Sequence, residues 1–280
     1  MSVKEYLLPQ SLAEAVKLLA QHGDSLLVMA GGTITMPLIN DGISRPDMVM
    51  GLRHAGLDYI RHSNSSLSIG AMTTLAEMSG DEAIPLLQQA TRNTGGWAIR
   101  NMGTVGGNLF APPPAGDVAV ALLALDAQVK LAGQSGDRLL PLADFYTGFM
   151  SNALQPDELL AEIQVSVPQG KTVYLKAGRK HANTPAIVTV AAHLLMDGEQ
   201  VKEARLALNA VGPHPLRATR AEEILVKAGR LDETTITASA AAAAEECEPF
   251  TDAIATEWYR RKMVGIYVKR VLAQIAGKEA

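Results

Sequence analysis

Two clusters of glycine and threonine, far apart in the chain, constrain its fold more than any other feature. The first, Ala30-Gly31-Gly32-Thr33, ends a short apolar run, SLLVMA. The second, Gly103-Thr104-Val105-Gly106-Gly107-Asn108, precedes another apolar run, DVAVALLAL. Glycine permits positive φ and lets a ligand approach the backbone, and consecutive N–H groups in a turn form a concave anion site. Both clusters suit a pyrophosphate, although for either one alone a tight turn with no ligand is an equal alternative.

The spacing of the glycines excludes the commonest nucleotide-binding patterns. Neither cluster reads GxGxxG, so the dinucleotide fingerprint of the Rossmann fold is absent. Gly170-Lys171-Thr172 resembles the end of a phosphate-binding P-loop, but Val165 stands where the first glycine of that motif belongs. A dinucleotide that binds here must therefore bind through another fold.

Apolar periodicity in the first half predicts short helices that alternate with short strands. A capping box at Ser11 and Glu14 opens a helix that Gly23 closes, and strands at 25–30 and 47–52 flank the first glycine turn as a βαβ-like unit. Further elements are expected as a hairpin over 59–70, a capping box at Thr74 and Glu77, helices over 84–93 and 117–125, and strands at 128–132, 138–140 and 159–167.

The composition changes near Pro168-Gln169-Gly170. Three longer strand candidates follow at 172–177, 186–196 and 201–211. The remainder is expected to be helical, with an alanine-rich segment over 235–246 and an amphipathic one over 253–275. We predict an α+β fold of two domains. The first, 1–168, has subdomains of about 1–55 and 56–168, and the second, 169–280, holds a three-stranded antiparallel sheet with packed helices.

Composition also limits the classes of function. The formal net charge is -4 with dispersed Lys and Arg, which argues against a nucleic-acid partner. Cys247 is the only cysteine, so the chain alone can form no disulfide, CxxC zinc site or iron–sulfur cluster, and the six histidines show no metal-ligand spacing. No apolar run approaches the length of a membrane span or a signal peptide, which predicts a cytoplasmic protein with no membrane insertion.

As a set, the motifs resemble the FAD motifs of the medium subunits of molybdenum hydroxylases, of the aerobic carbon monoxide dehydrogenase and xanthine dehydrogenase type. AGGT at 30–33, RNMGTVGGNLFAPPPAGD at 100–117 and YLKAGRK at 174–180 occur in family order and cover nearly the whole chain. The resemblance implies a two-part FAD-binding domain, with mixed sheets and helices, followed by a C-terminal flavoprotein domain.

The resemblance also implies a role for each glycine segment. Residues 30–34 and 104–108 would wrap the FAD pyrophosphate with backbone amides and with the hydroxyls of Thr33 and Thr104. Ile34 stands where many relatives have a polar residue, so no side-chain hydrogen bond is expected there.

Three further positions match family contacts. Asp117 would bind the adenosine side of FAD, although it would serve equally as a helix N-cap. Leu160 matches an apolar wall near the flavin, and Lys176 matches a lysine that stabilises the reduced flavin, with a core leucine and a solvated lysine as the plain alternatives. The expected FAD contacts are Met29, Ala30, Gly31, Gly32, Thr33, Ile34, Asn101, Thr104, Val105, Gly106, Gly107, Asn108, Asp117, Leu160 and Lys176.

By resemblance, the chain carries electrons and does not itself transform the substrate. A small partner subunit with [2Fe–2S] clusters would deliver electrons from a large molybdenum–pterin subunit, and FAD would pass them to NAD, a quinone or another acceptor. The implied assembly is a dimer of heterotrimers. Two alternatives stay open: a stand-alone FAD-dependent oxidase or dehydrogenase with its own substrate pocket, and an FAD-free scaffold that bridges the other two subunits.

Overall fold

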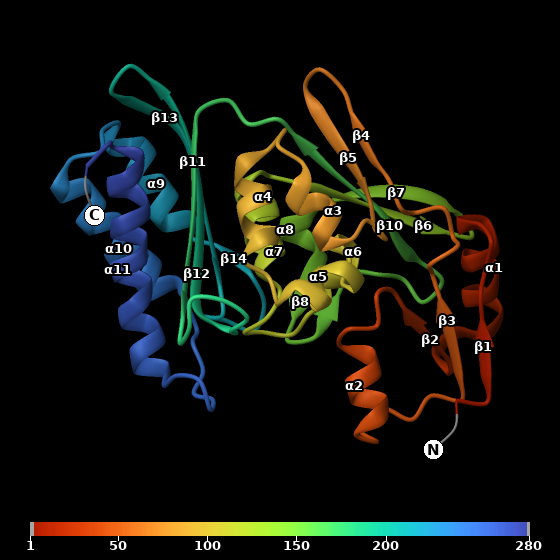
Figure 1. The fold of residues 1–280 in the computed structure, drawn as a ribbon. Coiled ribbons are helices and arrows are strands. Elements are labelled where there is room, and N and C mark those ends of the chain that lie inside the picture. The colour runs from red at the N-terminus through yellow and green to blue at the C-terminus, as the bar shows by residue number, and fades with distance from the viewer. Residues whose placement is uncertain (1–2, 279–280) are drawn as a thin grey trace.

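The computed structural model describes residues 3–278, so residues 1–2 of the first expected domain and 279–280 of the second lie outside the described range. The described residues form sheets of three, five, four and two strands with helices packed on them (Figure 1). This arrangement confirms the α+β class. None of the helices in this range is long and apolar enough to cross a membrane.

A three-stranded parallel sheet of order β1-β3-β2 begins the chain. β2 (Leu26–Met29) and β3 (Met48–Gly51) are parallel neighbours joined through α2 (Thr35–Asn40), which confirms the βαβ-like unit. β1 (Glu5–Leu7) pairs with the other edge of β3 and was not predicted, because three residues are too few to show an alternating pattern.

Helix α1 (Leu12–His22) covers this sheet and begins as expected. The hydroxyl of Ser11 accepts from the Glu14 N–H at 3.2 Å. The Glu14 carboxylate returns to the N–H of Gln10, at 2.7 Å, and not to that of Ser11, so the capping box is shifted by one residue. Gly23 ends the helix and starts a 3-10 turn, η1 (Gly23–Ser25).

The second part of the first domain is an antiparallel sheet of order β4-β5-β10-β6-β7. Its strands lie close to the predicted positions: β4 (Ile60–His62), β5 (Ser66–Gly70), β6 (Gln128–Gly133), β7 (Gly136–Pro141) and β10 (Leu159–Ser166). A small hairpin, β8 (Tyr146–Gly148) and β9 (Ser151–Asn152), follows the one-turn helix α8 (Leu142–Phe145).

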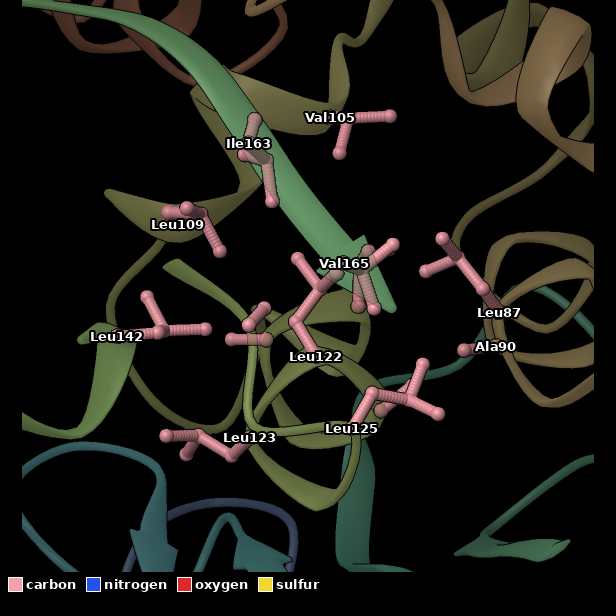
Figure 2. Close-up of a cluster of buried hydrophobic side chains, with 14 of the residues drawn as sticks. Leu87, Ala90, Val105, Leu109, Leu122, Leu123, Leu125, Leu142, Ile163 and Val165 are labelled. Carbon is pink, nitrogen blue, oxygen red and sulfur yellow. The ribbon is translucent and has the colours of Figure 1, made fainter. Parts of the chain in front are cut away.

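Five helices connect these strands: α3 (Leu75–Gly80), α4 (Pro85–Arg92), α5 (Trp97–Met102), α6 (Val105–Leu109) and α7 (Asp117–Ala124). The predicted capping box of α3 is present in both directions between Thr74 and Glu77. Every residue of α7 is buried, which explains why this helix is apolar on all sides. Figure 2 shows Leu122 and Leu123 of α7 among side chains of α4, α6, α8 and β10.

The C-terminal domain holds an antiparallel sheet of β11 (Lys171–Gly178), β12 (Ala186–Asp197), β13 (Gln200–Asn209) and β14 (Leu216–Arg217). The three predicted strands are present, but the sheet has a fourth strand, β14, which the prediction missed. With only two residues, β14 shows no periodic pattern in the sequence. Helices α9 (Thr219–Ala228), α10 (Glu233–Glu246) and α11 (Glu257–Ile275) cover one face of this sheet, and α4 and α7 lie on the other (Figure 1).

Two details of the last helices differ from expectation. Helix α9 lies in the part that was expected to be helical, but it was not predicted as a separate element. Helix α11 begins at Glu257 and not near 253, because the carboxylate of Asp252 accepts the N–H groups of Ile254 and Ala255 in a turn. The Thr256 hydroxyl then caps the first helical turn.

Candidate cofactor site

A cavity of about 600 Å³ opens where the two parts of the first domain meet the C-terminal domain. This volume is in the range that cofactor pockets occupy. Most of the expected contacts line it: Ala30, Gly31, Gly32, Thr33, Ile34, Thr104, Gly106, Gly107, Asn108, Asp117, Leu160 and Lys176. Segments that are distant in the chain therefore face one space, as a single bound ligand requires.

Three expected contacts lie away from this lining. Val105 is fully buried in the core below it. Asn101 is exposed, and its side-chain amide donates to the carbonyl of Trp97 in its own helix at 2.9 Å. Met29 ends β2 beside Gly51 and is also absent from the lining. In this structure none of the three side chains is placed to touch a ligand in the cavity.

Glycines of both segments pack directly against the backbone of other parts of the chain at the cavity. A Cβ on Gly31 would lie 1.8 Å from the carbonyl oxygen of Met102, and a Cβ on Gly106 would lie 2.6 Å from that of Ala71. No side chain fits in either place, so glycine is required for backbone to approach backbone. Close approach, more than turn geometry, is the reason for these glycines.

Positive φ matters at fewer positions than the sequence argument assumed. Of the five glycines in the two segments that line the cavity, only Gly32 has a positive φ, of 72°. Gly106 and Gly107 belong to helix α6, so the second segment is a short helix and not a bend. Gly107 is tight for another reason, since its Cβ would lie 2.9 Å from the Thr104 hydroxyl oxygen.

Free backbone donors are found in the first segment. Within residues 3–278, no backbone carbonyl accepts a hydrogen bond from the N–H groups of residues 31–34. In α6, by contrast, Val105 donates to Thr73, Gly106 donates to Ala71, and Gly107 donates to the Thr104 hydroxyl oxygen at 3.0 Å. The first segment therefore offers several backbone amides. The second offers the Thr104 hydroxyl hydrogen and the Thr104 N–H, for which no acceptor is found within residues 3–278.

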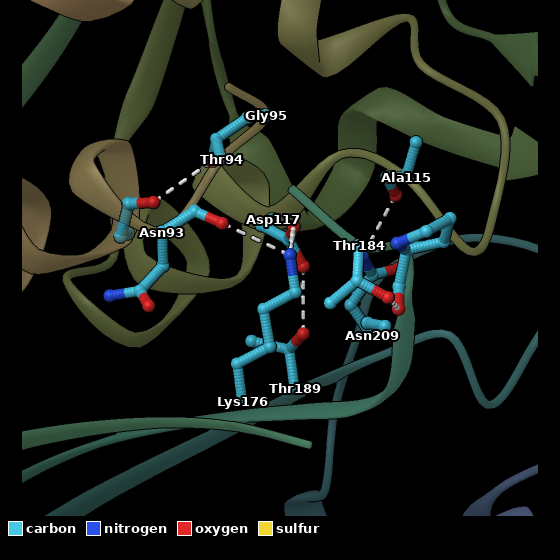
Figure 3. Close-up of polar contacts among 12 residues, drawn as sticks. Asn93, Thr94, Gly95, Ala115, Asp117, Lys176, Thr184, Thr189 and Asn209 are labelled. Carbon is cyan, nitrogen blue, oxygen red and sulfur yellow. Dashed lines mark hydrogen bonds and ion pairs between the residues drawn. The ribbon is translucent and has the colours of Figure 1, made fainter. Parts of the chain in front are cut away.

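A buried ion pair closes one wall of the cavity (Figure 3). The Lys176 Nζ lies 2.6 Å from Oδ2 of Asp117, with the two side chains 8% and 5% exposed, and it also donates to the carbonyl of Asn93 at 3.0 Å. The hydroxyl of Thr189 donates to Asp117 Oδ1 at 2.7 Å. Lys176 is therefore not a solvated lysine, and each charge has a partner, as burial requires.

Asp117 does not cap the helix that it begins. The N-cap residue of α7 is Gly116, with a φ of 84° and no side-chain cap. The Asp117 carboxylate instead turns toward the C-terminal sheet. Because Lys176 Nζ and Asp117 Oδ2 are 2.6 Å apart, the two charged groups face the same part of the cavity.

The sequence argument missed the parts of the lining that carry no glycine motif. Asn183, Thr184 and Pro185 reach the cavity from the turn between β11 and β12, and Thr94 and Gly95 reach it from the end of α4. Turn residues alone gave no signal of a site there.

The turn before β10 was missed as well. Leu154, Gln155 and Pro156 line the cavity, and Glu158 holds this turn by accepting the Gln155 N–H at 2.8 Å. Two Arg138 nitrogens contact the Glu158 carboxylate at 2.7 and 2.8 Å, and this contact lowers the pKa of Glu158. Glu158 is therefore held as an anion whose charge is balanced outside the cavity.

The family was determined by comparison with known proteins. The model of the FAD binding domain in molybdopterin dehydrogenase matches residues 1–169, and that of the CO dehydrogenase flavoprotein C-terminal domain matches residues 172–275. The chain belongs to the FAD-binding subunits of the molybdenum hydroxylases. The family that the glycine motifs and YLKAGRK indicated is thus confirmed, and the chain is an oxidoreductase subunit with an FAD-binding domain.

Similar family members match along the whole chain. The glyceraldehyde dehydrogenase medium chain of Sulfolobus acidocaldarius is 30% identical, over 97% of this chain and 98% of its own. The carbon monoxide dehydrogenase medium chain of Afipia carboxidovorans is 31% identical, over 96% and 95%. A solved carbon monoxide dehydrogenase from Hydrogenophaga pseudoflava superimposes with a TM-score of 0.93 at 31% identity, over 99% of this chain and 98% of that one.

The lining fits the cofactor of this family. The unbonded N–H groups of residues 31–34 suit a diphosphate, which needs several donors close together. Apolar side chains such as Leu75, Ile99 and Leu160 suit a planar ring system. The lining therefore offers the donors and the apolar surface that FAD requires.

Proposed function

We propose that this chain is the electron-transfer subunit of a molybdenum hydroxylase. In this role, electrons pass from a large molybdenum–pterin subunit to the [2Fe–2S] clusters of a small partner subunit and from there to this chain. The chain passes them through FAD to an external acceptor such as NAD or a quinone. One observation carries the proposal: free backbone donors and a buried ion pair line the same cavity.

Bound FAD would supply the redox chemistry, because an isoalloxazine exchanges electrons singly with clusters and in pairs with acceptors. The chain would bind and orient it. The N–H groups of residues 31–34, with the hydroxyls of Thr33 and Thr104, would hold the diphosphate. Lys176 would place a positive charge beside the flavin and so stabilise its reduced, anionic form, and Leu160 would exclude water.

Asp117 is assigned with Lys176 in this proposal and not at the adenosine side. Its carboxylate holds the lysine ammonium in place, since Nζ has both Asp117 and Asn93 as acceptors. A protonated lysine held by two acceptors cannot turn away from the cavity without losing both bonds.

Purification of the chain with whatever it binds tests the proposal. We expect about one FAD per chain by absorbance, and co-purifying subunits that carry iron–sulfur clusters and a molybdenum–pterin, in a complex whose measured mass corresponds to two heterotrimers. A folded but colourless protein bound to both subunits would instead indicate the scaffold. Substrate oxidation by the yellow chain alone would indicate the stand-alone oxidase.

A further inference from the structure

Three buried polar side chains form a row across the C-terminal sheet. Lys176 of β11 is the cross-strand partner of Thr189 of β12, and Thr189 is the partner of Asn209 of β13. Side chains at paired positions of neighbouring strands point to the same face. Thr189 and Asn209 are completely buried, so the row lies inside the molecule and faces the first domain.

Each member of this row bonds the start of α7. Lys176 donates to Oδ2 of Asp117 and Thr189 donates to Oδ1, while the Asn209 amide donates to the carbonyl of Ala115 at 2.8 Å (Figure 3). The C-terminal sheet thereby holds both oxygens of a carboxylate that belongs to the first domain. Thr189 itself is absent from the cavity lining, so any effect on a ligand must act through Asp117.

We propose that Thr189 is a positioning residue of the cofactor site: its hydroxyl fixes the Asp117 carboxylate and thereby the Lys176 ammonium at the cavity wall. The proposal rests on the proposed function, since it takes FAD as the ligand. Asp117 and Lys176 touch the cavity, whereas Thr189 stands behind them and sets their geometry.

The physical reason lies in the bonding of one oxygen atom. Among residues 3–278, Asp117 Oδ1 receives a hydrogen bond from Thr189 and from no other group. Without that hydroxyl, the oxygen would be a buried, charged acceptor with no donor, which is costly. The carboxylate would rotate toward another donor, and its bond with Lys176 would change with it.

Titration of FAD into the full-length apoprotein tests this inference. Thr189→Val keeps the shape of the side chain and removes the hydroxyl, and we expect it to weaken FAD binding about tenfold, the usual effect of losing a hydrogen bond to a charged group. The visible absorption of the bound flavin should shift as well, because the charges beside it move. Thr189→Ser, which restores the hydroxyl, should return both properties toward those of the wild type.

A control variant separates positioning from general destabilisation. Ser239 in α10 is also fully buried, and its hydroxyl donates to the carbonyl of Ala221 at 3.1 Å, away from the cavity. Ser239→Ala should lower the melting temperature and leave FAD affinity and the flavin spectrum unchanged. If it alters FAD binding as Thr189→Val does, the effect is one of domain stability and the inference is wrong.

A double-mutant cycle tests the route through Asp117. In the Asp117→Asn background, Thr189→Val should change FAD affinity less than about twofold, since no carboxylate is left to position. An equal fold-change in both backgrounds would overturn the inference.

The remaining outcomes are also decisive. Wild-type affinity and spectrum in Thr189→Val would overturn the inference and leave the proposed function standing, whereas a wild-type chain that takes up no FAD would overturn both. Should Thr189→Val not fold, Thr189→Ala takes its place. If neither variant yields folded protein, Thr189 has a structural role and the inference is wrong.

Discussion

The carbonyl oxygen of Met102 occupies the place where a side chain on Gly31 would begin. The separation of 1.8 Å from an ideal Cβ leaves no room for even a methyl group, and the obstacle is backbone, which cannot swing aside. The contact joins the βαβ unit to the segment before α6. The geometry of the cavity thus depends on the absence of a Cβ at position 31.

We therefore expect Gly31→Ala to separate the two segments, cost roughly 1 to 3 kcal/mol of unfolding free energy and abolish FAD retention. Flavin absorbance per folded chain after gel filtration measures the loss. Gly80→Ala is the matched control, because a Cβ on Gly80 meets nothing within 4 Å and its φ is not positive. Full FAD content in Gly31→Ala would show that the contact does not shape the site.

Gly107→Val should also abolish FAD retention and leave the C-terminal domain folded. The reason is steric: a branched side chain would push on the Thr104 hydroxyl, 2.9 Å from the Cβ position, and on Ala30, at 3.4 Å. Backbone conformation is not the cause, since Gly107 lies in a helix. Flavin content together with far-UV circular dichroism checks this prediction, and unchanged flavin content counts against the cavity as the site.

Lys176→Met should strongly destabilise the protein, because it removes one member of a buried ion pair. The substitution leaves the Asp117 carboxylate, which is 5% exposed, without a positively charged partner. Removing one partner of a buried ion pair lowers the free energy of unfolding by roughly 3 to 5 kcal/mol. The double variant Lys176→Met with Asp117→Asn removes both charges and should recover much of that stability. Urea unfolding of the three proteins provides the measurement, and a double variant as unstable as the single one would contradict a paired role.

Acid should weaken the turn that Glu158 holds. The Arg138 guanidinium lowers the pKa of Glu158 below its usual 4.5. A lowered folded-state pKa means that the stabilisation is complete above the unfolded value and is lost as pH falls through the folded value. The unfolding free energy of the wild type should therefore exceed that of Glu158→Gln at pH 7, and the gap should narrow below about pH 4.5.

Glu223→Gln is the control for this titration, because Glu223 is an exposed residue of α9 outside the cavity. Its stability should follow the wild type across the same pH range. A gap between wild type and Glu158→Gln that stays constant down to pH 3 would contradict the assigned ion pair.

Local signals predicted many of the elements, because these helices and strands carry their own periodicity and caps. The capping box of Thr74 and Glu77 and the strands β5, β10 and β12 are examples. β1 and β14 were not predictable, since two or three residues show no period and are strands only because a longer neighbour pairs with them.

The sequence indicated many of the residues that line the cavity, but not how they contact one another. Asp117 and Lys176 both matched family motifs, yet their pairing joins two domains, and no local pattern encodes a contact between positions so far apart. The hydrogen bonds of the α6 N–H groups could not be predicted for the same reason, because their acceptors, Thr73 and Ala71, lie in another segment. Sequence motifs indicated what lines the cavity, and tertiary packing decided which groups remain free to bind.

The burial of α7 on every side has a consequence for how this chain can be divided. The hydrophobic cluster around α7 includes Tyr174, Ala191 and Ala207, all from the C-terminal sheet. A truncated protein that stopped at the linker after β10 would expose an apolar helix to water and invite aggregation. Neither region is therefore expected to be stable when it is expressed without the other.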